Sequence, residues 1–282
     1  LWARKLSSGW ASALSGADAR ITSLKPELDW DSLKATARTG KADAFVVHGY
    51  EFDERGREAN LVPLLVPCVN NRAAMVEFVL LRRKPDKADG EAPPFRLMSL
   101  DGKKIRVDRA GCGELVYRWL DCEILTASGD PKREYFADFY SAKSAAEAVL
   151  DVYFGQMEAC VVSREDYLRV LSFNRAGISD RLEEARRSPP FLKHIIAGCT
   201  HPTKAARSKE LQKAAMGFSL NIGNQKYTLA EPKPEDMKNL RELITKWNSY
   251  FGKDRGEAQP GPEESPAPEP KPEPRVTDRR PR

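Results

Sequence analysis

Apolar runs and amphipathic segments alternate along most of the chain, and this alternation predicts its secondary structure. Short runs rich in branched apolar side chains are typical of buried strands, whereas apolar residues three or four positions apart are typical of helices. The expected strands are residues 44–47, 62–68, 75–81, 104–107, 158–162 and 194–197. The expected helices are residues 1–14, 31–38, 114–125, 145–154, 165–171, 208–215 and 234–251. Strands that alternate with helices predict an α/β fold with mainly parallel sheets flanked by helices.

Two segments, residues 31–48 and residues 144–163, share one pattern of helix, glycine and strand. In each, the helix is followed by Gly-x-x-(Asp/Glu)-Ala-x-Val-Val and then by a polar residue, which is His48 in the first segment and Ser163 in the second. In open α/β sheets the carboxyl ends of the strands face the ligand crevice. The two copies are separated by about the length of one lobe, so the pattern predicts two similar lobes. Chance similarity between two ordinary helix–strand units is the alternative interpretation.

Capping residues mark the ends of the two repeated helices. Asp31 and Ser144 are candidate N-caps, and Ser144 with Glu147 matches the capping-box pattern. Gly40 and Gly155 are candidates for the left-handed residue that ends each helix.

A third unit joins a strand to a helix through two glycines. Residues 101–108 read as a turn and a strand, and residues 109–114 follow as a loop that opens the next helix. Gly111 and Gly113 allow backbone N–H groups to approach an anion, and the positive end of the helix dipole favours negative charge. A tight turn that needs glycine for its own geometry explains the two residues equally well.

The charge of the chain is mildly basic, because 46 Lys and Arg stand against 41 Asp and Glu, a net charge of +5. This charge is compatible with an anionic ligand, but the two signs are interspersed, which excludes the dense basic stripe of a nucleic-acid-binding protein. No apolar run is long enough to span a bilayer. The chain begins at Leu1 rather than at a methionine, so we expect that an upstream segment such as a secretory signal peptide was removed.

The composition changes after Phe251. Residues 252–282 are rich in proline and almost lack large apolar side chains, so they cannot offset the entropy of ordering. We expect a disordered tail with polyproline II character that acts as a spacer or a solubilising segment rather than in recognition.

Catalytic and metal chemistry find little support in the sequence. The cysteines are odd in number, none stands in a Cys-x-x-Cys pair, and no zinc site or other cofactor is expected; they are Cys68, Cys112, Cys122, Cys160 and Cys199. A nucleophilic pair of Cys112 with His48 is conceivable, but no third residue that would orient it is evident. His194 lies in an apolar run and is expected in the core. The chain is therefore predicted not to be an enzyme.

Three stretches of the chain resemble the phosphate/phosphonate-type periplasmic substrate-binding proteins, which have the type 2 periplasmic-binding fold. These are residues 40–50, 100–108 and 155–163, and residues 185–191 resemble the return crossing between the lobes of that family. The resemblance implies two lobes joined by hinge strands, with the ligand held in the cleft between them. By this resemblance, one lobe comprises residues 1–85 with 190–250, the other comprises residues 95–188, and residues 75–81 and 191–197 lead through the hinge.

The resemblance also implies a set of ligand contacts. From the first lobe these are His48, Gly49 and Tyr50, and from the second they are Gly111, Cys112 and Gly113, with Ser163.

The chain departs from this family in two places. The family usually places Ser or Thr in the loop before the second-lobe helix, whereas residues 109–113 carry no hydroxyl. Arg109 either replaces these donors with a charge-assisted contact to the anion or is a solvated surface arginine. The family also opens with a strand before its first helix, and this chain begins within the helix, which would leave a gap or an exposed edge in the sheet.

Together these features predict an extracytoplasmic, periplasmic solute-binding protein. It would capture a small anionic solute, such as phosphate or a phosphonate, between its two lobes and deliver it to a membrane ABC permease. The alternative is a sensor or a protein-interaction module that keeps the same fold without transport.

Overall fold

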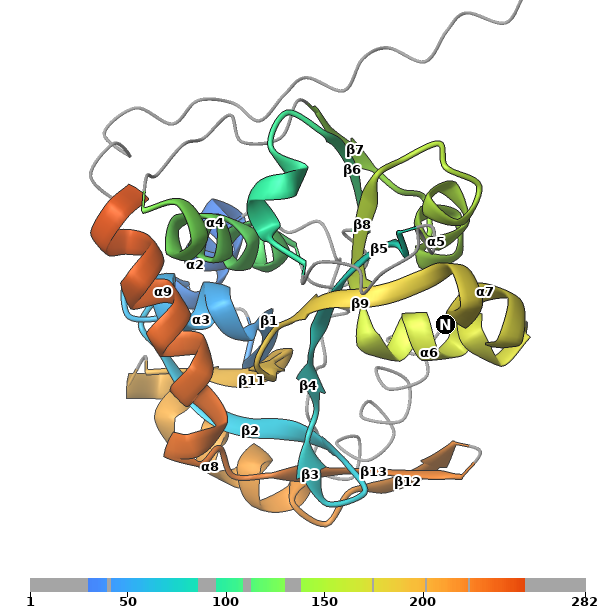
Figure 1. Ribbon diagram of the computed structural model, residues 1–282. Coiled ribbons are helices and arrows are strands. Elements are labelled where there is room, and N and C mark those ends of the chain that lie inside the picture. Colours follow the sequence, from blue (N-terminus) through green and yellow to red (C-terminus); the bar gives the residue numbers. More distant parts are fainter. Residues whose placement is uncertain are drawn as a thin grey trace, which may run out of the picture.

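The structure is a computed structural model that describes most of the chain between residues 30 and 251 (Figure 1). The expected helix at residues 1–14, the glycine stop at Gly40 and the Pro-rich tail at residues 252–282 lie outside the described residues. The described ranges are 30–39, 42–85, 95–108, 113–129, 138–173, 175–200, 202–222 and 224–251.

The first sheet has the strand order β1-β11-β2-β13-β12, with the short strand β3 paired to β2. Apolar side chains on one of its faces pack against α2, α3 and α9, and those on the other face pack against α8. Its strands are β1 (Ala44–His48), β2 (Leu61–Val69), β3 (Arg72–Ala73), β11 (His194–Cys199), β12 (Ser219–Ile222) and β13 (Gln225–Ala230). Its helices are α2 (Trp30–Arg38), α3 (Gly49–Arg55), α8 (Pro202–Ala215), η2 (Pro234–Met237) and α9 (Lys238–Phe251).

The second sheet has the strand order β7-β6-β8-β5-β9. Its central strand β5 is apolar on both faces, because Phe78 and Leu80 belong to the same core cluster as α4, whereas Val79 and Leu81 pack with α5 and α6. Its strands are β5 (Phe78–Arg83), β6 (Lys104–Val107), β7 (Asp138–Ser141), β8 (Ala159–Ser163) and β9 (Leu182–Arg187). The helices around it are η1 (Leu97–Leu100), α4 (Leu115–Ser128), α5 (Ala145–Tyr153), α6 (Arg164–Phe173) and α7 (Arg175–Arg181).

A two-stranded ribbon lies between the two sheets, and we call it the crossing ribbon. It pairs β4 (Met75–Val76) with β10 (Phe191–Leu192) in antiparallel register. The strand expected at residues 75–81 is thus divided at Glu77, because its first part pairs with β10 and its second part pairs with β8 and β9. Figure 1 shows these strands running from one sheet to the other.

The α/β class is confirmed, but the expectation of mainly parallel sheets is wrong. Every pairing described in the first sheet is antiparallel, and in the second sheet only β6 with β7 and β6 with β8 are parallel. The connections explain the difference. Only two residues join β12 to β13, which forces an antiparallel hairpin, and the strands that return between the sheets, β5 and β11, run against their neighbours.

The second repeated helix has the expected ends. The backbone N–H of Glu147 donates to the Ser144 hydroxyl over 3.2 Å, and the Glu147 carboxylate accepts from the backbone N–H of Lys143 rather than from that of Ser144. Gly155 has a φ of +77°, as expected for a left-handed helix stop. In the first repeated helix, Asp31 lies within the first turn and is not the cap, because α2 already begins at Trp30. Over the described ranges, no helix combines the length and the apolar character that crossing a membrane requires.

Candidate ligand site at the junction of the two sheets

His48 ends strand β1 and stands directly opposite His194 on β11. Their rings stack with 4.9 Å between centroids. The Tyr50 ring stacks against the ring of His48 with 5.8 Å between centroids. A three-ring stack therefore begins in the first sheet and extends through Tyr50, a buried residue of α3, toward the second sheet. The stack involving His194 was not predicted, since its apolar run indicated only a core position.

Burial keeps both imidazoles neutral near physiological pH. It lowers the pKa of His194 to about 3, with smaller contributions from the charges of His48 and Lys193. Burial also lowers the pKa of His48, although the Glu51 carboxylate and a hydrogen bond to the Lys193 backbone oppose this shift. A neutral imidazole both donates and accepts a hydrogen bond, so His48 has the chemistry to orient a polar ligand.

Tyr50 reaches from α3 to the start of α4. Its hydroxyl oxygen accepts a hydrogen bond from the backbone N–H of Glu114 and donates to Glu51 Oε1 over 3.3 Å. A side-chain Cβ at Gly113 would stand only 2.6 Å from this hydroxyl oxygen. Gly113 also has a φ of +54°, a conformation that favours glycine. Glycine is therefore required at this point by two independent constraints.

A buried cation fixes α4 against α3 and α9. The Arg118 guanidinium, 3% exposed in its side chain, pairs with the Glu54 carboxylate of α3, which is 10% exposed. The same guanidinium lies over the Trp247 ring of α9 at 4.7 Å and over the Tyr50 ring at 5.4 Å. The Trp247 indole N–H in turn donates to Asp121 of α4 over 2.9 Å. Neither Arg118 nor Glu54 was singled out from the sequence, because the two residues stand 64 positions apart and meet only through tertiary packing.

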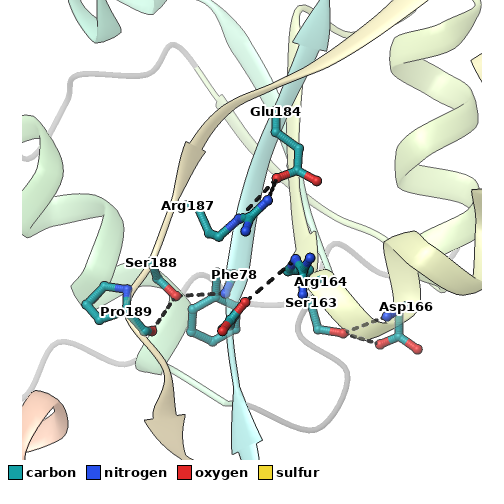
Figure 2. Close-up of polar contacts among 9 residues, drawn as sticks. Phe78, Ser163, Arg164, Asp166, Glu184, Arg187, Ser188 and Pro189 are labelled. Atoms are coloured by element: carbon teal, nitrogen blue, oxygen red, sulfur yellow. Dashed lines mark hydrogen bonds and ion pairs between the residues drawn. The ribbon is translucent and has the colours of Figure 1, made fainter. Parts of the chain in front are cut away.

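Ser163 ends β8 as expected, but its hydroxyl serves the helix that follows. It donates to Asp166 Oδ2 over 2.6 Å and accepts from the Asp166 backbone N–H over 3.1 Å (Figure 2). This is the geometry of an N-cap with a reciprocal side-chain contact at the start of α6.

Ion pairs flank the crossing ribbon where it meets the second sheet. Figure 2 shows Arg187 beside Glu184 on β9. The hydrogen bond to Glu184 raises the pKa of Arg187, and the charge of Glu77 adds a smaller contribution. The Glu77 carboxylate itself lies 3.7 Å from the Arg164 guanidinium. Each cation here faces a carboxylate, so this cluster does not present a strong excess of positive charge.

Of the residues expected in the site, the structure brings together His48, Tyr50 and Gly113. Gly49 lies between His48 and Tyr50 at the start of α3. A Cβ at Gly49 would stand 2.4 Å from the Leu192 carbonyl oxygen, so the lack of a side chain permits close packing against the crossing ribbon. Arg109, Gly111 and Cys112 lie outside the described residues.

Replacement of Gly113 by alanine tests the contact with Tyr50. Gly129 at the other end of α4 is a matched control, because its φ is +72° and a Cβ there meets nothing within 4 Å. We expect Gly113→Ala to lower the free energy of unfolding by about 1 kcal/mol more than Gly129→Ala, the low end of the range for overpacking, because the hydroxyl is the far end of a side chain. Urea denaturation measures both values, and equal losses would contradict the contact.

Within the described residues, four cysteines are buried thiols that form no disulfide, and burial makes them poor nucleophiles. It raises the pKa of Cys122 to about 11 and also raises those of Cys68 and Cys160. We expect Ellman's reagent to leave these thiols and Cys199 unmodified in the native protein and to modify them after denaturation. Rapid labelling of any of them in the folded protein, located by mass spectrometry, would contradict this packing.

Comparisons with known proteins identify the fold. No protein-family model matches the sequence, and no curated protein matches it. Among solved structures, XAC2383 from Xanthomonas citri bound to ATP is similar with a TM-score of 0.62 at 13% identity, over 87% of this chain and 92% of that one. PhnD1 from Prochlorococcus marinus in complex with methylphosphonate has a TM-score of 0.56 at 14% identity, over 86% and 91%. A binding protein component of an ABC phosphonate transporter from Pseudomonas aeruginosa has a TM-score of 0.56 at 12% identity, over 87% and 82%. The chain therefore has a fold like that of the type 2 periplasmic-binding proteins.

Proposed function

We propose that this protein binds a small anionic solute at the junction of its two sheets. In this proposal, the first sheet with its helices forms one lobe, residues 1–85 with 190–250, and the second sheet forms the other, residues 95–188. The crossing ribbon is the hinge between them. The fold is shared with solute-binding proteins, among them one bound to methylphosphonate.

The observation that carries the proposal is the meeting of Tyr50 with Gly113 and Glu114. It brings a side chain of α3 to the N-terminus of the 14-residue helix α4. Backbone N–H groups at a helix N-terminus favour an anion, and His48 adds a neutral donor beside them. Ligand-binding sites of α/β proteins form at such junctions.

Arg109 is proposed to supply the positive charge of this site. The carboxylates of Glu51 and Glu114 both act on the Tyr50 hydroxyl, so an anion there needs a compensating cation. We expect Arg109→Gln to weaken anion binding by about 1.5–3 kcal/mol, the range for hydrogen bonds to charged groups. The exposed Lys103→Gln is the control and should leave affinity unchanged. Equal affinities of the two variants, measured by calorimetry, would remove Arg109 from the site.

A thermal-shift panel tests the proposed function itself. It comprises inorganic phosphate, methylphosphonate, methanesulfonate, acetate and ATP, each at millimolar concentration. A ligand that binds only the folded state raises the melting temperature by mass action, so at least one anion should do so in a saturable manner. Absence of any shift across the panel would contradict the proposal.

The buried Arg118–Glu54 pair favours a second candidate, a sensor or protein-interaction module that has lost transport. This pair ties α4 to α3 inside the protein, and such a contact opposes separation of the two lobes. Small-angle scattering distinguishes the candidates, because a transporter component should change its radius of gyration when the anion is added, whereas a fixed module should not.

The protein would work outside the cytoplasm, and its partner in transport would be an ABC permease. No cofactor and no catalytic step are proposed. The alternative that Cys112 and His48 form a nucleophilic pair is tested by Cys112→Ala, which should leave anion binding intact.

A further inference from the structure

Helix α4 begins without a cap of its own. Glu114 is the N-cap residue, but its backbone is in the right-handed helical region and its side chain makes no capping hydrogen bond. The first N–H groups of a helix lack intrahelical partners and need an acceptor from elsewhere. The N-terminus of α4 is thus a place where an external oxygen atom is stabilised.

The Tyr50 hydroxyl supplies that oxygen from another part of the chain. It accepts from the Glu114 N–H, and its proton is donated to Glu51 Oε1 over 3.3 Å. Gly113 makes room for it, because any Cβ at that position would stand 2.6 Å from the hydroxyl oxygen. The phenol therefore fits the helix terminus in the way a ligand oxygen would.

One N–H of a buried side chain beside the phenol lacks a hydrogen-bond partner, although the same side chain pairs with Glu54 through another nitrogen. The Arg118 side chain is only 3% exposed, and its Nε–H is buried without a hydrogen-bond partner. The guanidinium that carries this N–H lies over the Tyr50 ring at 5.4 Å. Buried donors usually have acceptors, so this one marks a position where an acceptor is missing while the Tyr50 ring is in place.

We propose that Tyr50 is an intramolecular plug, whose hydroxyl occupies the anion position at the N-terminus of α4 and is displaced when the ligand binds. This inference rests on the proposed function. A ligand that replaces the phenol would take over the Glu114 N–H and would meet the unpartnered Nε–H of Arg118. The protein would therefore bind its solute in competition with its own side chain.

Tyr50→Phe tests the plug because it removes only the hydroxyl and keeps the stacked ring. Tyr250→Phe is the matched control, since Tyr250 is exposed on α9. Without ligand, hydrogen exchange of the Glu114 amide should be about three- to ten-fold faster in Tyr50→Phe than in the wild type, the factor that one net hydrogen bond supplies. The control should exchange at the wild-type rate.

The second arm measures affinity for inorganic phosphate and methylphosphonate by calorimetry. The plug predicts binding about three- to ten-fold tighter in Tyr50→Phe than in the wild type. Weaker binding in Tyr50→Phe would overturn the plug and make Tyr50 a direct ligand contact, while the proposed function would stand. Unchanged exchange at Glu114 would overturn the plug without reference to any ligand. If neither protein binds any anion of the panel, the proposed function fails and the plug with it.

Discussion

Arg118→Leu is expected to lower the free energy of unfolding by about 3–5 kcal/mol, the usual result of breaking a buried ion pair. The reason is the carboxylate left behind: Glu54 is only 10% exposed, and without its cation it remains buried and uncompensated. The variant also lacks the contacts that the guanidinium makes with the rings of Trp247 and Tyr50. Urea denaturation followed by circular dichroism measures the change.

Arg241→Leu is the matched control. Arg241 of α9 also pairs with a carboxylate of α3, that of Asp53, over 3.0 Å. Its side chain is 56% exposed, so solvent screens this pair. Arg241→Leu should lower the free energy of unfolding by no more than about 1 kcal/mol. Combining Arg118→Leu with Glu54→Leu should recover much of the loss, because no charge is then left buried. Equal losses in Arg118→Leu and Arg241→Leu would show that the buried pair does not hold α4 in place.

His194→Gln is expected to make the protein less sensitive to acid. The pKa of His194 is lowered to about 3 in the folded protein, against an ordinary value of 6.5, so the unfolded chain binds the proton more readily. The stability contributed by neutral His194 is therefore complete above about pH 6.5 and is lost as the pH falls from there toward about 3. At about pH 5 this loss amounts to about 2 kcal/mol, the product of 1.36 kcal/mol and the pKa interval crossed.

The free energy of unfolding of the two proteins, measured at about pH 7.5 and at about pH 5, isolates this effect. Other groups also titrate over this interval, but their contributions are common to the wild type and to His194→Gln. The wild type should lose about 2 kcal/mol more than the variant between the two pH values. Equal losses would show that the pKa of His194 is not lowered in the folded protein.

Much of the fold could be predicted because its buried elements have strong patterns. Strands β2, β8 and β11 are apolar runs, and the last helix follows from apolar residues at helical spacing after Pro234. Strand β9 could not be predicted, since Leu182–Arg187 is largely charged and forms an edge of its sheet. The parallel arrangement was wrongly expected because alternation of strands and helices does not reveal which strands return between the sheets.

The candidate site was predicted only where a local sequence pattern marks its residues. His48 stands where a repeated helix–strand unit ends, and Gly113 stands where a strand turns into a helix, so local patterns identify both. His194, Glu54 and Arg118 come to the junction only through tertiary packing, and no local pattern marks them. Ser163 has the expected position, but its hydroxyl is engaged by Asp166, which the sequence spacing of three residues could have indicated.

Chemical-shift mapping locates the anion-binding site on the protein. The anion that gives the largest thermal shift is added to isotope-labelled protein, and the backbone amide signals are followed to saturation. Binding at the junction predicts that the largest changes occur at His48, Tyr50, Gly113 and Glu114. Saturable binding with its largest changes elsewhere, and none at these four residues, would contradict an anion site at the junction.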